Sequence, residues 1–218
     1  MEATLELPGL LRLRLDGVAQ CYLVRDDDGV TVIDTGTAGH AGPIARWAAE
    51  FGPVRRIVLT HHHADHAGSA AALRALTGAP VLAHAADAPV VRGEVEPPPP
   101  VLTDEDRPLW EAIAPPPPPA PPCPVDGEVA DGDVLPFGGG ARVLSIPGHT
   151  DGSIALHLPA LGVLFTGDAL ASVGGPLRPG VFNTDRVRLE ESVRRLLAVG
   201  ADLVCVGHGK PVRTGAPR

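Results

Sequence analysis

Short runs of apolar residues recur along this chain, and most of them end at a glycine or a polar residue. The run Arg56–Thr60 is continuous and β-branched, which predicts a strand buried on both faces. The pattern then becomes helical, since Leu73 and Leu76 supply an apolar stripe and Gly78 stands where a C-terminal cap is expected. We therefore expect a strand and a helix that starts near Asp65, joined by a short loop.

Four further apolar runs end in the same way. Loops at strand ends carry function on a rigid scaffold, so such ends indicate a common edge where distant residues meet. Strands expected at 141–146, 153–158 and 162–166, with a helix at about 184–199, favour the α/β class. The four runs, each with the polar residue that follows it, are Val30–Ile33 with Asp34, Val143–Ile146 with His149, Val163–Phe165 with Asp168, and Leu203–Val206 with His208.

The loop after the first run carries an unusual density of metal-binding groups. Four imidazoles and one carboxylate fall within His61–His66, in the spacing H-x-H-x-D-H. Imidazole with carboxylate suits zinc, or iron and manganese at a less selective site. From this loop His61 and His63 can point at one ion, while Asp65 and His66 point at a neighbouring one. A histidine-rich tract without a site is the alternative, and the potential ligands at the other strand ends argue against it.

The ordered motifs H-x-H-x-D-H, P-G-H-T, T-G-D and G-H-G resemble the metallo-β-lactamase superfamily over about Cys21 to Val212. This resemblance implies an α/β (α+β) fold, a four-layer αββα sandwich with the site along one edge of its two sheets. Asp34 resembles an aspartate that supports the ligands of that family from behind. The resemblance also implies seven metal ligands: His61, His63 and His149 for one ion, Asp65, His66 and His208 for a second, and Asp168 between both.

The chemistry implied by the resemblance is hydrolysis. Two divalent ions roughly 3.5 to 4 Å apart share a water and lower its pKa. The expected function is a metal-dependent hydrolase whose metal-bridging hydroxide attacks a small ester, thioester, lactone or related acyl substrate. Asp168 and Asp65 are the expected catalytic residues, Asp168 fixing the separation of the ions and Asp65 shuttling a proton. Zinc is the ion expected first, with iron and manganese as alternatives.

Two other functions stay open at this point. One is a mononuclear iron dioxygenase that acts on a persulfide, and the other is a binding protein that kept the metals but lost turnover. Without an extra C-terminal domain, a specialist for glutathione thioesters is expected less than a general acyl hydrolase. Relatives that act on lactones often place a tyrosine near the reacting carbonyl, and Tyr22, in an early strand-like run, is the only tyrosine here.

Composition agrees with one α/β domain over residues 1–218. The chain is 44% hydrophobic with a net charge of −8, which argues against nucleic acid as a partner. The N-terminus lacks a secretion signal and no span reaches membrane length, so we expect a cytoplasmic protein with no membrane partner. A small molecule is the expected partner, and a homodimer is compatible. Cys21 and Cys205 are expected to be buried, and the arginines of the predicted helix at 184–199 to form a solvated face.

One proline-rich insertion, at about 93–124, interrupts the chain. Residues 97–124 hold 13 of the 25 prolines, and proline runs avoid helix interiors and central strands. The insertion is either a semi-rigid surface loop or a lid whose Trp110 walls a substrate pocket. Arg178 and Asn183, after Asp168, are further candidates for substrate contacts. The remaining histidines are expected to make local contacts rather than to bind metal: His40, His62, His84 and His157.

Overall fold

The N-terminal part of the chain builds one sheet in sequence order. In the computed structural model, which describes residues 1–15, 19–113 and 118–214, neighbouring strands pair from β1 through to β7. The first four strands are antiparallel, and β4 to β7 are parallel. The strands are β1 (Glu2–Leu7), β2 (Leu10–Leu15), β3 (Ala19–Asp26), β4 (Gly29–Ile33), β5 (Val54–Val58), β6 (Val81–His84) and β7 (Gly127–Val129).

The C-terminal part builds a second sheet, in the order β15-β14-β11-β10-β9-β8. Only β11 and β14 pair in parallel, and a helix connects them. A separate two-stranded sheet, β12 with β13, follows the Asp168 turn. The strands are β8 (Val134–Leu135), β9 (Ala141–Ser145), β10 (Ile154–Leu158), β11 (Val163–Phe165), β12 (Leu170–Ala171), β13 (Arg178–Pro179), β14 (Leu203–Cys205) and β15 (Val212–Arg213).

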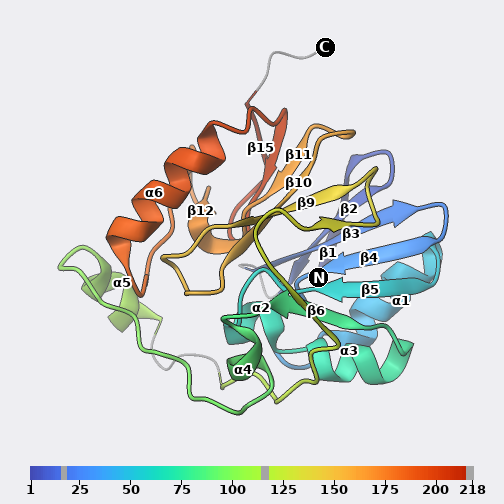
Figure 1. Ribbon diagram of the computed structural model, residues 1–218, viewed down its shortest axis with the longest axis horizontal. Coiled ribbons are helices and arrows are strands. Elements are labelled where there is room, and N and C mark those ends of the chain that lie inside the picture. The colour runs from blue at the N-terminus through green and yellow to red at the C-terminus, as the bar shows by residue number, and fades with distance from the viewer. Residues whose placement is uncertain (16–18, 114–117, 215–218) are drawn as a thin grey trace.

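The two sheets pack face to face, and helices cover the outer face of each (Figure 1). Helices α1 (Ala41–Phe51) and α3 (Ala70–Thr77) bury Ile44 and Leu73 against the first sheet, while α6 (Arg186–Leu197) buries Leu189 against the second. A third apolar layer lies between the sheets, where the rings of Tyr22 and Phe165 meet at 5.1 Å. The molecule is therefore the four-layer αββα sandwich that the sequence led us to expect.

The helix expected after the histidine loop is broken in two, so the prediction of one continuous helix is wrong. Helix α2 (Ala64–Ala67) ends at Gly68, where a side chain would meet the backbone nitrogen of Ala38 at 2.7 Å. The Oγ of Ser69 then donates to the carbonyl of Thr37, before α3 begins. Close packing against a distant loop interrupts the helix, whereas its expected end at Gly78, with φ 70°, is confirmed.

The proline-rich insertion contains one short helix among its described residues and is attached to the body near both ends. Helix α4 (Ala88–Val91) comes before it and α5 (Asp106–Ala112) lies within it. The backbone nitrogen of Cys123 donates to Val91, and that of Val101 donates to Asn183. Residues 114–117, which include part of the second proline run, lie outside the described residues. Figure 1 shows the insertion passing beside one end of α6.

The arginines of α6 and the cysteines Cys21 and Cys205 lie in the settings that we expected. Arginines of α6 pair with acidic residues of neighbouring segments, as Arg195 does with Asp131 at 2.8 Å, which fits a solvated face. Cys21 and Cys205 are buried, and neither is in a disulfide. In the described part of the chain, no helix combines the length and the apolar character needed to cross a membrane.

Candidate metal centre

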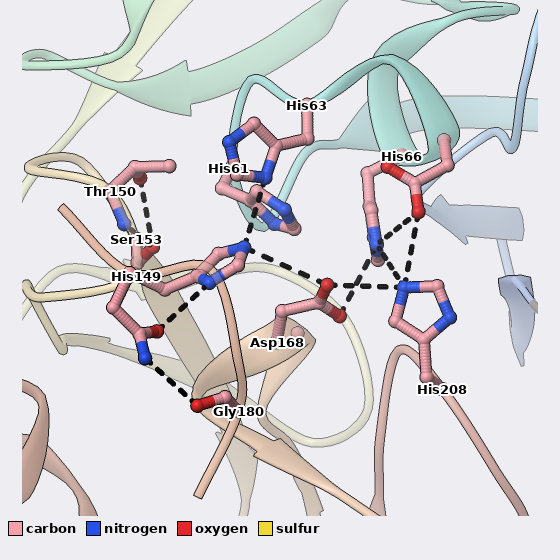
Figure 2. Close-up of polar contacts among 12 residues, drawn as sticks. His61, His63, His66, His149, Thr150, Ser153, Asp168, Gly180 and His208 are labelled. Atoms are coloured by element: carbon pink, nitrogen blue, oxygen red, sulfur yellow. Dashed lines mark hydrogen bonds and ion pairs between the residues drawn. The ribbon is translucent and has the colours of Figure 1, made fainter. Parts of the chain in front are cut away.

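Four strand ends, those of β5, β9, β11 and β14, bring seven side chains together at one edge of the sandwich (Figure 2). Strands β4 and β5 run in parallel, as do β11 and β14, and β9 runs in the direction of β11 because both are antiparallel to β10. Their carboxyl ends lead into the loops of the motifs. Two groups form there, each with its donor atoms within 4.8 Å of one another: His61, His63 and His149, the first cluster, and Asp65, His66, Asp168 and His208, the second cluster.

The first cluster consists of imidazoles alone. Nδ1 of His63 lies 2.9 Å from Nε2 of His149, and the buried Nε2 of His61 has no hydrogen-bond partner among the described residues. Burial and the nearby His66 and His63 lower the pKa of His61 well below its ordinary value. Burial and His149 lower the pKa of His63 to about 3. These rings are therefore neutral at pH 7 and offer lone pairs.

The second cluster combines two imidazoles with two carboxylates. Nε2 of His208 lies 3.1 Å from both Asp65 Oδ2 and Asp168 Oδ2, and Nε2 of His66 lies 3.2 Å from Asp168 Oδ1. Burial lowers the pKa of His208, but Asp168 and Asp65 outweigh it and raise that pKa to about 10. The same carboxylates raise the pKa of the buried His66 well above its ordinary value.

The donor set fits divalent metal ions. Buried imidazole nitrogens that face one another at close range, and a buried nitrogen left without a partner among the described residues, are what a shared cation satisfies. Asp168 reaches both clusters, since its Oδ2 lies 3.7 Å from His149 Nε2 as well as 3.1 Å from His208 Nε2. Asp168 thus lies between the two clusters.

Asp34 orients one imidazole of each cluster. Its Oδ1 accepts from the backbone nitrogen of Thr60 at 2.7 Å, and its Oδ2 accepts from the Thr60 hydroxyl at 2.7 Å. The same Oδ2 lies 2.9 Å from His66 Nδ1, and the Thr60 hydroxyl lies 3.0 Å from His61 Nδ1. Both rings therefore turn Nε2 toward the clusters, which fixes the ligand nitrogen and its tautomer.

Asp87 is a structural support that the sequence patterns did not reveal. Its Oδ2 accepts from the backbone nitrogen of His62 and from the Thr150 hydroxyl, both at 2.9 Å, and its Oδ1 accepts from Gly152 at 2.8 Å. It ties the first histidine loop to the loop of His149. The sequence did offer one sign of this role. Asp87 follows the end of β6 at His84 by three residues, much as the cluster residues follow the ends of their own strands.

The three candidates for substrate contacts lie in different settings. The side-chain oxygen of Asn183 lies 3.2 Å from His149 Nδ1 and its amide nitrogen donates to the carbonyl of Gly180, so both ends of the amide bond to the protein itself. Trp110 packs edge-on against Phe182 at 5.0 Å. Arg178 is exposed in β13, and among the described residues its side chain makes no hydrogen bond or ion pair with either cluster.

Three of the other histidines, and the tyrosine, have local partners. The buried His62 ring has Nδ1 3.0 Å from Asp87, and His84 Nδ1 accepts from the backbone nitrogen of Ala86. His40 Nδ1 lies 3.0 Å from the carbonyl of Thr37. The Tyr22 hydroxyl donates to the carbonyl of Val206 at 2.7 Å, deep between the sheets, so it is not placed to assist a reacting carbonyl.

Comparisons with known proteins agree with this geometry. The family model described as the metallo-beta-lactamase superfamily matches residues 14–208. A hydroxyacylglutathione hydrolase of Cereibacter sphaeroides (strain ATCC 17025 / ATH 2.4.3) is 37% identical over 173 residues, which cover 78% of this chain and 54% of that protein. One of Rhodobacter capsulatus is 33% identical over 187 residues, 83% and 57% of the two chains. The chain thus spans about half the length of these curated relatives.

Solved structures show the same fold. A metallo-beta-lactamase of Cronobacter sakazakii with a HARLDQ motif superposes with a TM-score of 0.72 at 26% identity, over 96% of this chain and 78% of that one. The di-iron-bound form of TTHA1623 superposes with a TM-score of 0.67 at 27% identity, over 93% of each chain.

Proposed function

The chain belongs to the metallo-beta-lactamase superfamily, and from this premise we propose that it is a binuclear metal-dependent hydrolase of small acyl substrates. In this proposal the first cluster binds one divalent ion, the second cluster binds another, and Asp168 contacts both. The observation that carries the proposal is the gathering of seven donor side chains into two adjacent groups, with donor atoms within 4.8 Å in each group. Zinc is the ion proposed first, because histidine and carboxylate ligands suit it.

Ions bound there would activate a water molecule and polarise the acyl carbonyl. The protein side chains have separate tasks around them. Asp168 has 12% of its side chain exposed and is held between both clusters, so it fixes geometry. Asp65 has 27% exposed and lies nearer solvent, which makes it the carboxylate better placed to pass a proton to the leaving group. Asp34 and Asn183 keep the imidazoles in their tautomers.

A thioester is the proposed first choice among acyl substrates. The curated relatives at 33% to 37% identity carry the name hydroxyacylglutathione hydrolase, which denotes cleavage of a thioester. Loss of a thiolate needs little assistance beyond an activated water, which bound ions would supply, and one proton donor, for which Asp65 is placed. The contact of Trp110 with Phe182 brings the insertion to the loop of Asn183, so the insertion is proposed to wall the approach to the first cluster.

The test is reconstitution of the metal-depleted protein with zinc, manganese or iron(II), followed by assays on thioesters, lactones, β-lactams and phosphodiesters. We expect thioester or lactone hydrolysis that depends on added metal and is abolished by Asp168→Ala and by His149→Ala. His157→Gln, at a histidine of β10 outside both clusters, is the matched control and should retain the wild-type rate.

Two results would contradict the proposal in different ways. Oxygen consumption with a persulfide and iron, without hydrolysis, would indicate a dioxygenase. Tight metal binding with no turnover on any substrate would indicate a binding protein.

A further inference from the structure

A cleft of about 600 Å³ lies beside the second cluster. The residues that line it have no part in the proposed hydrolysis. Its walls come from β2, from Gln20 at the start of β3, from residues 172–175 after β12, and from residues 209–213. Its volume falls in the range of small-molecule sites. No aspartate or glutamate is among the described residues that line it, whereas four lining residues are cationic: Arg12, Arg14, Lys210 and Arg213.

The cleft is joined directly to the loop of His208. Ser172 donates its backbone nitrogen to the carbonyl of His208 at 3.0 Å, and the amide side chain of Gln20 donates to the carbonyl of Gly209 at 2.7 Å. Strand β2 runs in the direction of β4, because both are antiparallel to β3, so its carboxyl end reaches the metal edge. Two peptide units separate Lys210 from His208, at most roughly 7.6 Å between their Cα atoms.

Its attachment to the loop of His208 places the cleft on one side of the candidate metal centre. In Figure 2, His208 lies at the side of the second cluster remote from His149. Gly209 and Lys210, which line the cleft, follow His208 directly in the chain, so the cleft adjoins this side of the centre.

The four cations differ in how far the protein already neutralises them. Arg12 is buried and forms an ion pair with Glu6 at 2.6 Å, so its charge is already neutralised within the protein. Arg14 faces Glu2 at 3.5 Å with both side chains about half exposed, and such pairs are weak. Arg213 donates to a neutral acceptor, the carbonyl of Glu6. Lys210 is exposed and is the only lysine of the chain; the described residues place no carboxylate at ion-pair distance from it.

A positive cleft is unexpected on a chain with a net charge of −8. Such a chain repels anions at long range, but salt screens distant charges beyond about 8 Å, so the cations of the cleft dominate locally. Val173, Pro211 and Val212 line the same cleft and offer apolar surface beside the cations. The combination suits an anionic oxygen group on a short carbon chain.

We propose that this cleft binds a carboxylate or phosphate carried by the leaving group of the substrate, with Lys210 and Arg213 as its principal partners. The inference rests on the proposed function in assigning the anion to a substrate, and it narrows that function to acyl compounds with an anionic tail.

The kinetic test uses three acetyl thioesters that share one acyl group. Their thiols are mercaptoethanol, which is neutral, mercaptopropionate, and mercaptoethyl phosphate. Wild-type protein loaded with metal should prefer one of the anionic thioesters through a lower KM. In Lys210→Ala the ratio of kcat/KM for anionic over neutral thioester should fall about tenfold, as expected for loss of a hydrogen bond to a charged group. Lys210→Arg should restore the ratio. The control Arg142→Gln also removes one positive charge, but from β9 and not from the cleft, so it should leave the ratio unchanged.

A binding test needs no turnover. Reductive methylation with ¹³C-formaldehyde keeps the charge of Lys210 and labels it together with the N-terminal amine, and Lys210→Arg identifies which signal is which. Thioether analogues with the three tails are then titrated into the labelled protein. The Lys210 signal should shift with an anionic tail and not with the neutral one, and the larger of the two anionic shifts distinguishes carboxylate from phosphate.

Failures of the two proposals are distinguishable. The cleft assignment is overturned if the Lys210 signal does not shift with any of the three analogues, or if Lys210→Ala leaves the kinetic ratio unchanged. Either result counts against it even if thioesters are hydrolysed. If no thioester is cleaved but the signal shifts with anionic tails alone, the hydrolase proposal fails while the anion site is supported.

Discussion

The first and second clusters lie side by side and each contains a buried histidine, yet they have opposite electrostatic character. His61 is 2% exposed and His66 is fully buried, so desolvation acts strongly on both. The pKa of His61 nevertheless falls well below its ordinary value, and the pKa of His66 rises well above it. Burial penalises a charged imidazole in both places, but only the second cluster contains carboxylates that repay the penalty.

The difference shows that neighbouring charge, rather than depth, decides the state of a buried histidine here. The first cluster presents neutral lone pairs, whereas the second concentrates negative charge in Asp65 and Asp168. The supports differ in the same way: Asn183 holds His149 through a neutral amide, while Asp34 holds His66 through a carboxylate. Substitutions that affect one cluster, both or neither can separate these contributions.

The largest effect is expected from Gly207→Ala, which targets the second cluster. A Cβ on Gly207 would lie 2.1 Å from Asp168 Oδ1 and 2.6 Å from His66 Cε1, so both ligands must move. Displacing ligands should cost more than loss of a supporting bond, so we expect at least about a 100-fold loss of activity. Metal content should fall from two ions to one. The control Gly42→Ala, in helix α1, meets nothing nearer than 3.9 Å and should be active. Two bound ions and full activity in Gly207→Ala would refute the steric argument.

Asp34→Asn should weaken both clusters. The amide cannot accept all three of the bonds that Asp34 receives from Thr60 and His66, so the ring orientations of His61 and His66 are lost together. We expect a 10- to 100-fold loss of affinity at both metals, measured by competition with a chelator. Asp34 has φ 59°, and asparagine tolerates that conformation, so backbone strain does not complicate the result.

The exposed Asp28→Asn serves as the charge-matched control for Asp34→Asn. If Asp34→Asn lowers the affinity for only one of the two ions, the hydrogen bond that links Asp34 through Thr60 to His61 is unimportant for metal binding.

Asn183→Ala should affect the first cluster alone. His149 loses the acceptor for its Nδ1, whereas no ligand of the second cluster bonds Asn183. We expect roughly a tenfold loss of affinity for one ion, resolved by calorimetric titration of the metal-depleted protein. Asn183→Asp retains an acceptor and should recover most of the affinity. Equal weakening of both ions would mean that the clusters are coupled through Asp168 more strongly than the distances suggest.

The smallest effect is expected from Asp126→Asn, away from both clusters. Asp126 accepts from Arg74 at 2.7 and 2.9 Å and from the backbone nitrogen of Val81, and these bonds, the one to Arg74 first, lower its pKa to about 2. A depressed pKa stabilises the fold above the unfolded value of 3.8, and this stability is lost as the pH falls toward 2.

The free energy of unfolding of Asp126→Asn should therefore be about 1 kcal/mol lower than that of the wild type at pH 7. The difference should shrink between pH 4 and pH 2. Denaturant unfolding at several pH values measures it. Metal content should stay that of the wild type, and a change in it would show that this distant pair influences the site.

Expectations drawn from the sequence succeeded where the signal is local. Apolar runs that end in histidine or aspartate mark strand ends at one edge, because strand burial and loop chemistry are both read from adjacent residues. The break at Gly68 was missed because its cause is contact with residues 37–38, about thirty positions away. The bond between Asn183 and His149 was not predicted, because nothing near Asn183 in sequence shows that His149, 34 residues earlier, needs an acceptor.

The sequence alone determined the set of donor residues, the apolar runs that carry them and the class of fold, since these depend on residue type and short-range pattern. Only the tertiary structure decided which atoms face one another: that Asp34 serves both clusters, that Asp87 joins two loops, and that Lys210 and Arg14 share a cleft. Hydrogen bonds and charges act over a few ångströms, whereas these partners lie from 25 to nearly 200 residues apart in the chain.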